Sequence, residues 1–91
     1  MKENKKKATS GNSKQKTYQL ILLNDDENTF DDVIEILMEF CGYTIYQAEQ
    51  CAVIVDNNGK VVIRTGTQQK INKMANLLRN EGLNVDVKKE Q

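Results

Sequence analysis

The residues with the clearest chemistry are Asn24, Asp25 and Asp26, which come directly after the apolar segment 18–23. Amide and carboxylate oxygens accept hydrogen bonds, so together they suit a cation or an amine with several N–H donors. Unpaired carboxylates are costly to bury, which places them at the surface. The segment is therefore a turn that leads into a helix, because Asn and Asp favour turns, or a recognition site, or both.

Charge is distributed unevenly along the 91 residues, although 13 basic and 13 acidic residues give a net charge of zero. Residues 1–16 have a net charge of +5 and residues 17–91 a net charge of −5, and no Lys or Arg lies between Thr17 and Gly59. This pattern indicates a negative face that favours basic or amino-bearing partners and opposes nucleic acid. Residues 1–16 have too few apolar groups to offset the entropy of ordering, so we expect a disordered Lys-rich tail.

Composition argues against several other classes of protein. No apolar run approaches the roughly 18 residues of a membrane-spanning helix, and no apolar stretch follows the first lysines as in a secretory signal. The chain has no histidine and only Cys41 and Cys51, too few ligands for a zinc site. We expect both thiols to be buried in the core, with a disulfide as the open alternative. We also expect a monomer in the reducing cytoplasm. No nucleophile elbow or phosphate loop indicates an enzyme.

Local patterns predict six elements in the order strand, helix, helix, strand, helix, strand. The predicted strands are residues 18–23, 60–65 and 84–88. Each helix begins after a threonine cap, and the caps are Thr29, Thr44 and Thr67. Because the first strand is apolar on both faces, it is expected in the centre, antiparallel to its neighbours. The predicted fold is α+β, with a three-stranded antiparallel sheet packed against three helices in one domain, residues 17–91.

Helical spacing also predicts which residues face the core. On the second helix these are Ile45, Ala48, Cys51, Ala52 and Val55. Tyr43 and Tyr46 flank the start of that helix, and we expect one to pack inward and the other to lie at the surface. The carboxylates of the first helix, from Asp31 to Glu39, are expected to form a solvated face.

The series Leu23-Asn24-Asp25-Asp26, followed at matching distances by Val33-Ile34 and Gly59-Lys60, resembles the ClpS-type adaptors of the Clp protease system. The resemblance covers about residues 18–64. It implies a protein that is not an enzyme and needs no cofactor or metal. Such adaptors dock on the N-terminal domain of a Clp-type AAA+ unfoldase and deliver protein substrates with free N-termini, recognising the N-terminal residue.

The same resemblance implies site residues. The substrate α-amino group would be received by Asn24, Asp25, Asp26 and Asp56, the last standing where the family usually has histidine. The pocket wall would be formed by Asn28, Phe30, Val33, Ala52 and Val55. Contacts to the unfoldase would fall at Gln69, Lys73 and Met74. The alternative hypothesis is a small protein-interaction domain of ribosomal-stalk-like fold, which would not bind N-terminal residues.

Overall fold

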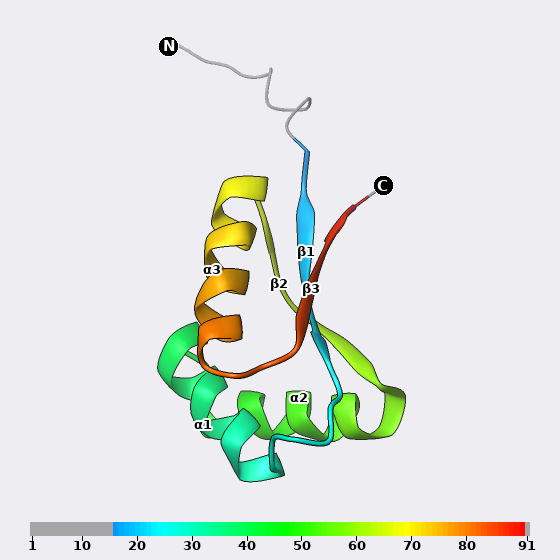
Figure 1. The fold of residues 1–91 in the computed structure, drawn as a ribbon, viewed down its shortest axis with the longest axis vertical. Coiled ribbons are helices and arrows are strands. Elements are labelled where there is room, and N and C mark those ends of the chain that lie inside the picture. Colours follow the sequence, from blue (N-terminus) through cyan, green and yellow to red (C-terminus); the bar gives the residue numbers. More distant parts are fainter. Residues whose placement is uncertain (1–15, 91) are drawn as a thin grey trace.

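The computed structural model describes residues 16–90, which form one three-stranded sheet and three helices (Figure 1). The strands β1 (Tyr18–Leu23), β2 (Lys60–Gly66) and β3 (Val85–Lys89) lie in the order β2-β1-β3, and β1 is antiparallel to both neighbours. The predicted α+β fold and the central position of the first strand are therefore confirmed. The prediction of a disordered tail falls, apart from Lys16, outside the described residues.

The helices are α1 (Phe30–Cys41), α2 (Ile45–Asn58) and α3 (Gln68–Asn80). Figure 1 shows α3 alongside the strands, whereas α1 and α2 lie near the end of the sheet where β1 leads into the first connection. Within residues 16–90, none of the helices has the length and apolar character that crossing a bilayer requires.

The starts of α1 and α2 are set by reciprocal capping, in which the predicted threonine caps take part. The Thr29 hydroxyl accepts a hydrogen bond from the Asp32 N–H at 3.0 Å, and the Asp32 carboxylate accepts one from the Thr29 N–H. Thr44 and Gln47 repeat this arrangement at the start of α2. Each pair satisfies two backbone donors that a helix start would otherwise leave unpaired.

The core lies between the helices and one face of the sheet. Its largest fully buried side chains are Leu20, Leu22, Leu37, Ile71 and Leu78. Cys41 is also buried and Cys51 is half-buried, and both are free thiols, so no disulfide joins them.

One predicted core position is wrong. Ile45 is 58% exposed, because the buried face of α2 consists of Ala48, Ala52 and Val55, and Ile45 precedes Ala48 at the very start of the helix, where the core has not yet begun. The prediction for the tyrosines is confirmed, since Tyr43 packs against the core and Tyr46 is exposed.

The connection between α1 and α2 is attached to β2 by two side chains. Arg64 Nη2 donates to the Cys41 carbonyl at 2.6 Å, and its guanidinium carbon lies 5.9 Å from the centre of the Tyr43 ring. The Tyr43 hydroxyl donates to the carbonyl of Ile63, the extra residue of β2 where its pairing with β1 shifts register. The Arg64 charge also complements the negative end of α1, whose last turn has no basic residue.

Candidate functional site

The acidic turn after β1 is built by Asp25. One of its carboxylate oxygens, Oδ1, accepts hydrogen bonds from the backbone N–H groups of Glu27 and Asn28, both at 2.9 Å. The Asn28 side-chain amide lies within 3.3 Å of Oδ1 and 3.2 Å of Oδ2. Asp25 is therefore already an acceptor for its own turn, the role that Asp commonly takes at such positions.

Asn28 connects this turn to a distant part of the chain. Its amide nitrogen also donates to the Gly82 carbonyl at 2.8 Å, in the connection between α3 and β3. Close by, the Leu23 N–H donates to the Asn84 carbonyl at 2.8 Å. The acidic turn is thus held against the α3–β3 connection by one side-chain and one backbone hydrogen bond, which positions the start of α1 relative to that connection.

These hydrogen bonds determine the charge state of Asp25. Partial burial would raise the pKa of its carboxyl, but the hydrogen bonds from Asn28 and Glu27 outweigh burial, so the pKa lies below the ordinary value of 3.8. Each donor interacts more strongly with the carboxylate than with the neutral acid. Asp25 is therefore negative at neutral pH, and some acceptor capacity remains on Oδ2.

The structure brings the other predicted amine-binding residues to the same end of the sheet. The Asn24 N–H donates to the Gly59 carbonyl at 2.9 Å, so the end of β1 lies beside the end of α2. Asp56 is in the last turn of α2 and is exposed, as are Asn24 and Asp26. The last turn of α2, which contains Asp56, therefore lies on the Asn24 side of the acidic turn. Asp25 is linked through Asn28 to the other side, where the α3–β3 connection lies.

The predicted wall residues lie in three different environments. Ala52 and Val55 are only 1% and 4% exposed, and Val33 is half-buried against the core. Phe30 is 46% exposed at the first position of α1. It is therefore not a core residue, and its ring is accessible to a ligand. The remaining predicted wall residue is Asn28, which serves instead in the link to Gly82.

A second surface lies between α3 and the outer edge of β2. A groove of about 450 Å³ there includes Lys73 and Met74, two of the three predicted contacts to the unfoldase. Gln69 is exposed but outside this groove. The full lining is Arg64, Thr65, Gly66, Lys70, Ile71, Lys73, Met74 and Leu77.

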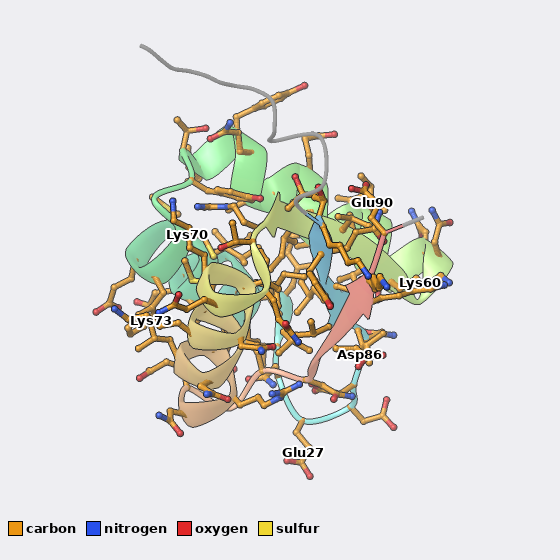
Figure 2. The ribbon with its side chains drawn as sticks, turned by 90° about the horizontal axis from the view of Figure 1, so that it is seen from above. Glu27, Lys60, Lys70, Lys73, Asp86 and Glu90 are labelled. Atoms are coloured by element: carbon orange, nitrogen blue, oxygen red, sulfur yellow. The ribbon has the colours of Figure 1, made fainter. Side chains whose placement is uncertain are left out.

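Sequence reasoning missed Lys70 and Leu77 in this groove. The sequence contains a pattern that indicates this face. Lys70, Met74 and Leu77 are spaced four and three residues apart, as on one face of a helix. Leu77 is 41% exposed, which marks that face as one the core does not cover. Figure 2 shows Lys70 and Lys73 projecting from the side of α3 away from the strands. The groove therefore combines an apolar floor with a basic rim.

Comparison with known proteins identifies the fold and the family. The solved structure of Agrobacterium tumefaciens ClpS2 bound to L-phenylalaninamide is similar, with a TM-score of 0.71, 19% identity, and coverage of 85% of this chain and 100% of that one. At this identity the likeness shows the fold alone.

Curated relatives are similar at the level of sequence. They are the ATP-dependent Clp protease adapter proteins ClpS of Campylobacter jejuni subsp. jejuni strain 81-176 and subsp. doylei strain 269.97. Each is 40% identical over 57 residues, which are 63% of this chain and 59% of the relative. The match thus spans less than two thirds of those relatives.

The family assignment follows from a match over most of the chain. Residues 13–86 match the model of the ATP-dependent Clp protease adaptor protein ClpS. This range contains the acidic turn, all three helices and the groove beside α3. The chain therefore belongs to the ClpS family of Clp protease adaptors.

Proposed function

We propose that this protein holds substrates by their N-terminal residue and delivers them to a Clp-type AAA+ unfoldase, with no catalytic step of its own. The observation that carries the proposal is the hydrogen bond between the Asn24 N–H and the Gly59 carbonyl, which joins the acidic turn to the last turn of α2. It places exposed amide and carboxylate oxygens from two elements at one end of the sheet. An α-ammonium group, with three donors and a positive charge, suits such acceptors.

The ligand of the similar ClpS2 structure supports this chemistry. L-phenylalaninamide has a free α-amino group, an aromatic side chain and an amide in place of a carboxylate, like the first residue of a polypeptide. In this chain Asn24 and Asp56 would receive the amino group directly. Asp25 would hold the turn in position and contribute its negative charge, because its oxygens already accept the hydrogen bonds of the turn.

The proposal is tested by calorimetric titration with peptides that begin with Leu, Phe, Tyr or Trp, each with a free and an N-acetylated terminus. Free peptides should bind, and acetylation should abolish binding because it removes the positive charge. Asp56→Asn should weaken binding by a factor of roughly 2 to 5, as expected for one exposed ion pair. The matched control is Asp86→Asn, an exposed aspartate on β3. Equal binding of acetylated and free peptides would refute an amine site.

The groove beside α3 is the proposed docking surface for the unfoldase. Its apolar floor supplies area that a partner can cover, and the ammonium groups of Lys70 and Lys73 favour an acidic partner surface. Binding is measured by titration against the isolated N-terminal domain of a Clp-type unfoldase. Lys73→Glu should weaken it, whereas Lys88→Glu, on exposed β3, should not. Absence of binding by the wild-type chain would argue against delivery, and equal binding of both variants would place the contact elsewhere.

A further inference from the structure

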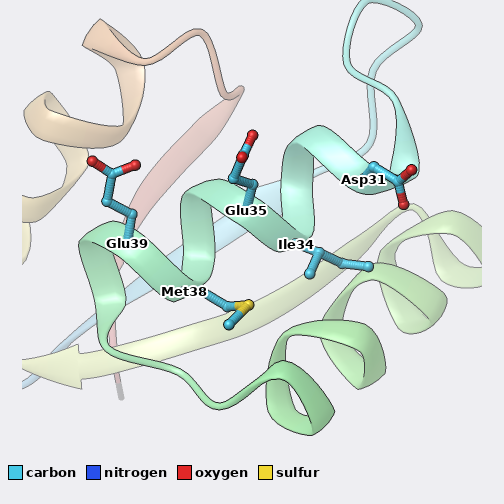
Figure 3. Close-up of a pocket in the computed structure, with 5 residues that line it drawn as sticks. All are labelled: Asp31, Ile34, Glu35, Met38 and Glu39. Carbon is cyan, nitrogen blue, oxygen red and sulfur yellow. The ribbon is translucent and has the colours of Figure 1, made fainter.

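One face of α1 combines acidic and apolar side chains at the surface. Asp31, Glu35 and Glu39 follow one another at four-residue intervals and are exposed, and Met38 beside them is 39% exposed. With Ile34 they line a shallow groove of about 520 Å³. Figure 3 shows Glu35 and Glu39 projecting together from one edge of this face and Ile34 and Met38 from the other. We call these five residues the acidic α1 face.

The charges of Glu35 and Glu39 are unfavourable for the helix itself, whereas Asp31 lies in the first turn, near the positive end of the helix dipole. Like charges four residues apart on a helix repel each other. Glu39 lies in the last turn, near the negative end of the helix dipole, where a carboxylate is disfavoured and a cation is favoured. No Lys or Arg occurs between Thr17 and Gly59, so no side chain of α1 or α2 compensates these carboxylates. Arg64 of β2 acts at the end of the helix, where it donates to the Cys41 carbonyl. A cationic occupant would remove these repulsions.

The chain contains a segment with matching charge. Residues 1–16 have a net charge of +5, and three of the lysines are consecutive, at Lys5–Lys7. A lysine has a long aliphatic stem that can lie on apolar side chains while its ammonium group reaches a carboxylate. This segment therefore matches both properties of the acidic α1 face. Its ammonium groups complement the carboxylates, and the aliphatic stems of its lysines can cover Ile34 and Met38.

The geometry of the chain permits this contact within one molecule. Arg64 pairs with Leu20 across the sheet and donates to the carbonyl of Cys41, so the end of α1 lies near the middle of β1. The path from Lys16 to the end of α1 has three parts. It runs about 13 Å along β1 to Leu20, about 5 Å across to Arg64 on β2, and then along the Arg64 side chain to the Cys41 carbonyl. Lys5–Lys7 precede Lys16 by nine to eleven residues, which span up to about 30 to 40 Å when extended.

We propose that Lys5–Lys7 dock on the acidic α1 face of the same molecule. Each contact is a surface ion pair and weak by itself. Because the segment is covalently linked to the face, docking is intramolecular, and a weak site can be occupied without added ligand as long as residues 8–15 span the distance. This proposal does not depend on the adaptor function.

The test is nuclear magnetic resonance of the full chain, comparing amide resonances of the wild type with those of the triple variant Lys5→Gln, Lys6→Gln and Lys7→Gln. The resonances of residues 31–39 should shift, because the cations leave the carboxylates, and those of β3 should not. The matched control replaces Lys70, Lys88 and Lys89 with Gln, which removes the same charge elsewhere and should leave residues 31–39 unchanged. Raising the salt concentration from about 0.05 to about 1 M should abolish the difference between wild type and triple variant.

A charge exchange provides the second measurement. Lys5→Glu, Lys6→Glu and Lys7→Glu should release the face, and adding Glu35→Lys and Glu39→Lys to that variant should restore a salt-sensitive contact. Unshifted resonances of residues 31–39 in the triple glutamine variant would overturn the proposal. A shift that depends on protein concentration over a roughly tenfold range would also overturn it, since the segment would then dock on a second copy.

Discussion

Replacing Asp25 by Asn tests whether this carboxylate is a structural part of the turn. The new amide oxygen can still accept hydrogen bonds from the backbone N–H groups of Glu27 and Asn28, which lie 2.9 Å from Oδ1. The other position becomes an NH₂ group that faces the Asn28 amide, so the contact to Oδ2 at 3.2 Å is lost. Because the site is partly exposed, the expected loss in the free energy of unfolding is about 1 kcal/mol at neutral pH.

The pH dependence of this loss distinguishes a charged acceptor from a neutral one. The pKa of Asp25 is lower in the folded protein than its ordinary value of 3.8, so its carboxylate stabilises the fold above that value. The contribution is lost as the pH falls from about 3.8 through the folded pKa. Urea unfolding at a series of pH values should therefore show a difference between wild type and variant that is constant at neutral pH and shrinks below about pH 4.

The matched control is Asp26→Asn, which changes the same charge at the adjacent exposed position. It should change the free energy of unfolding by less than about 0.5 kcal/mol, the usual range for an exposed substitution. Equal losses for the two variants, or a loss at Asp25 that is the same at acid and neutral pH, would refute a structural role for the Asp25 carboxylate.

Four further outcomes are expected. Thr44→Ala removes the acceptor for the Gln47 N–H at 3.1 Å and should lower stability by about 1 kcal/mol in thermal denaturation. Arg64→Met removes the hydrogen bond to the Cys41 carbonyl and should cost about 1 to 2 kcal/mol, with faster hydrogen exchange at the end of α1. Burial raises the pKa of Cys41 and Cys51 above 9.0, so both thiols should react slowly with alkylating reagents at pH 8. Because the folded pKa values are raised, the stability that these thiols contribute should decrease as the pH rises above about 9.

The helices were predictable because their ends are encoded locally. Thr29 with Asp32 and Thr44 with Gln47 are three residues apart, and each pair satisfies the backbone donors of its own helix without help from the rest of the fold. The central position of β1 was also predictable. A strand that is apolar on both faces is typical of an interior position, and Ile21, on the opposite face from Leu20, is only 7% exposed.

The candidate site was less predictable because it depends on contacts between distant residues. Sequence reasoning could not distinguish Asp25 as a turn residue from Asp25 as a ligand, since both require the same residue type. The link from Asn28 to Gly82 joins positions 54 residues apart and leaves no local pattern. Ile45 was misplaced because spacing shows which residues share a helix face, but not how far the core extends along it.

The two capping boxes also have a consequence for how specificity can change. The threonines that begin α1 and α2, and the glycines with φ of 70° and 86° that end them, are distinct from the wall residues predicted from the sequence on the two helices, Phe30, Val33, Ala52 and Val55. Helix boundaries and wall shape are therefore encoded by separate residues. Phe30, which is exposed at the first position of α1, can therefore be varied in laboratory evolution to test for a different first residue while Thr29 and Gly42 keep the boundaries of the helix.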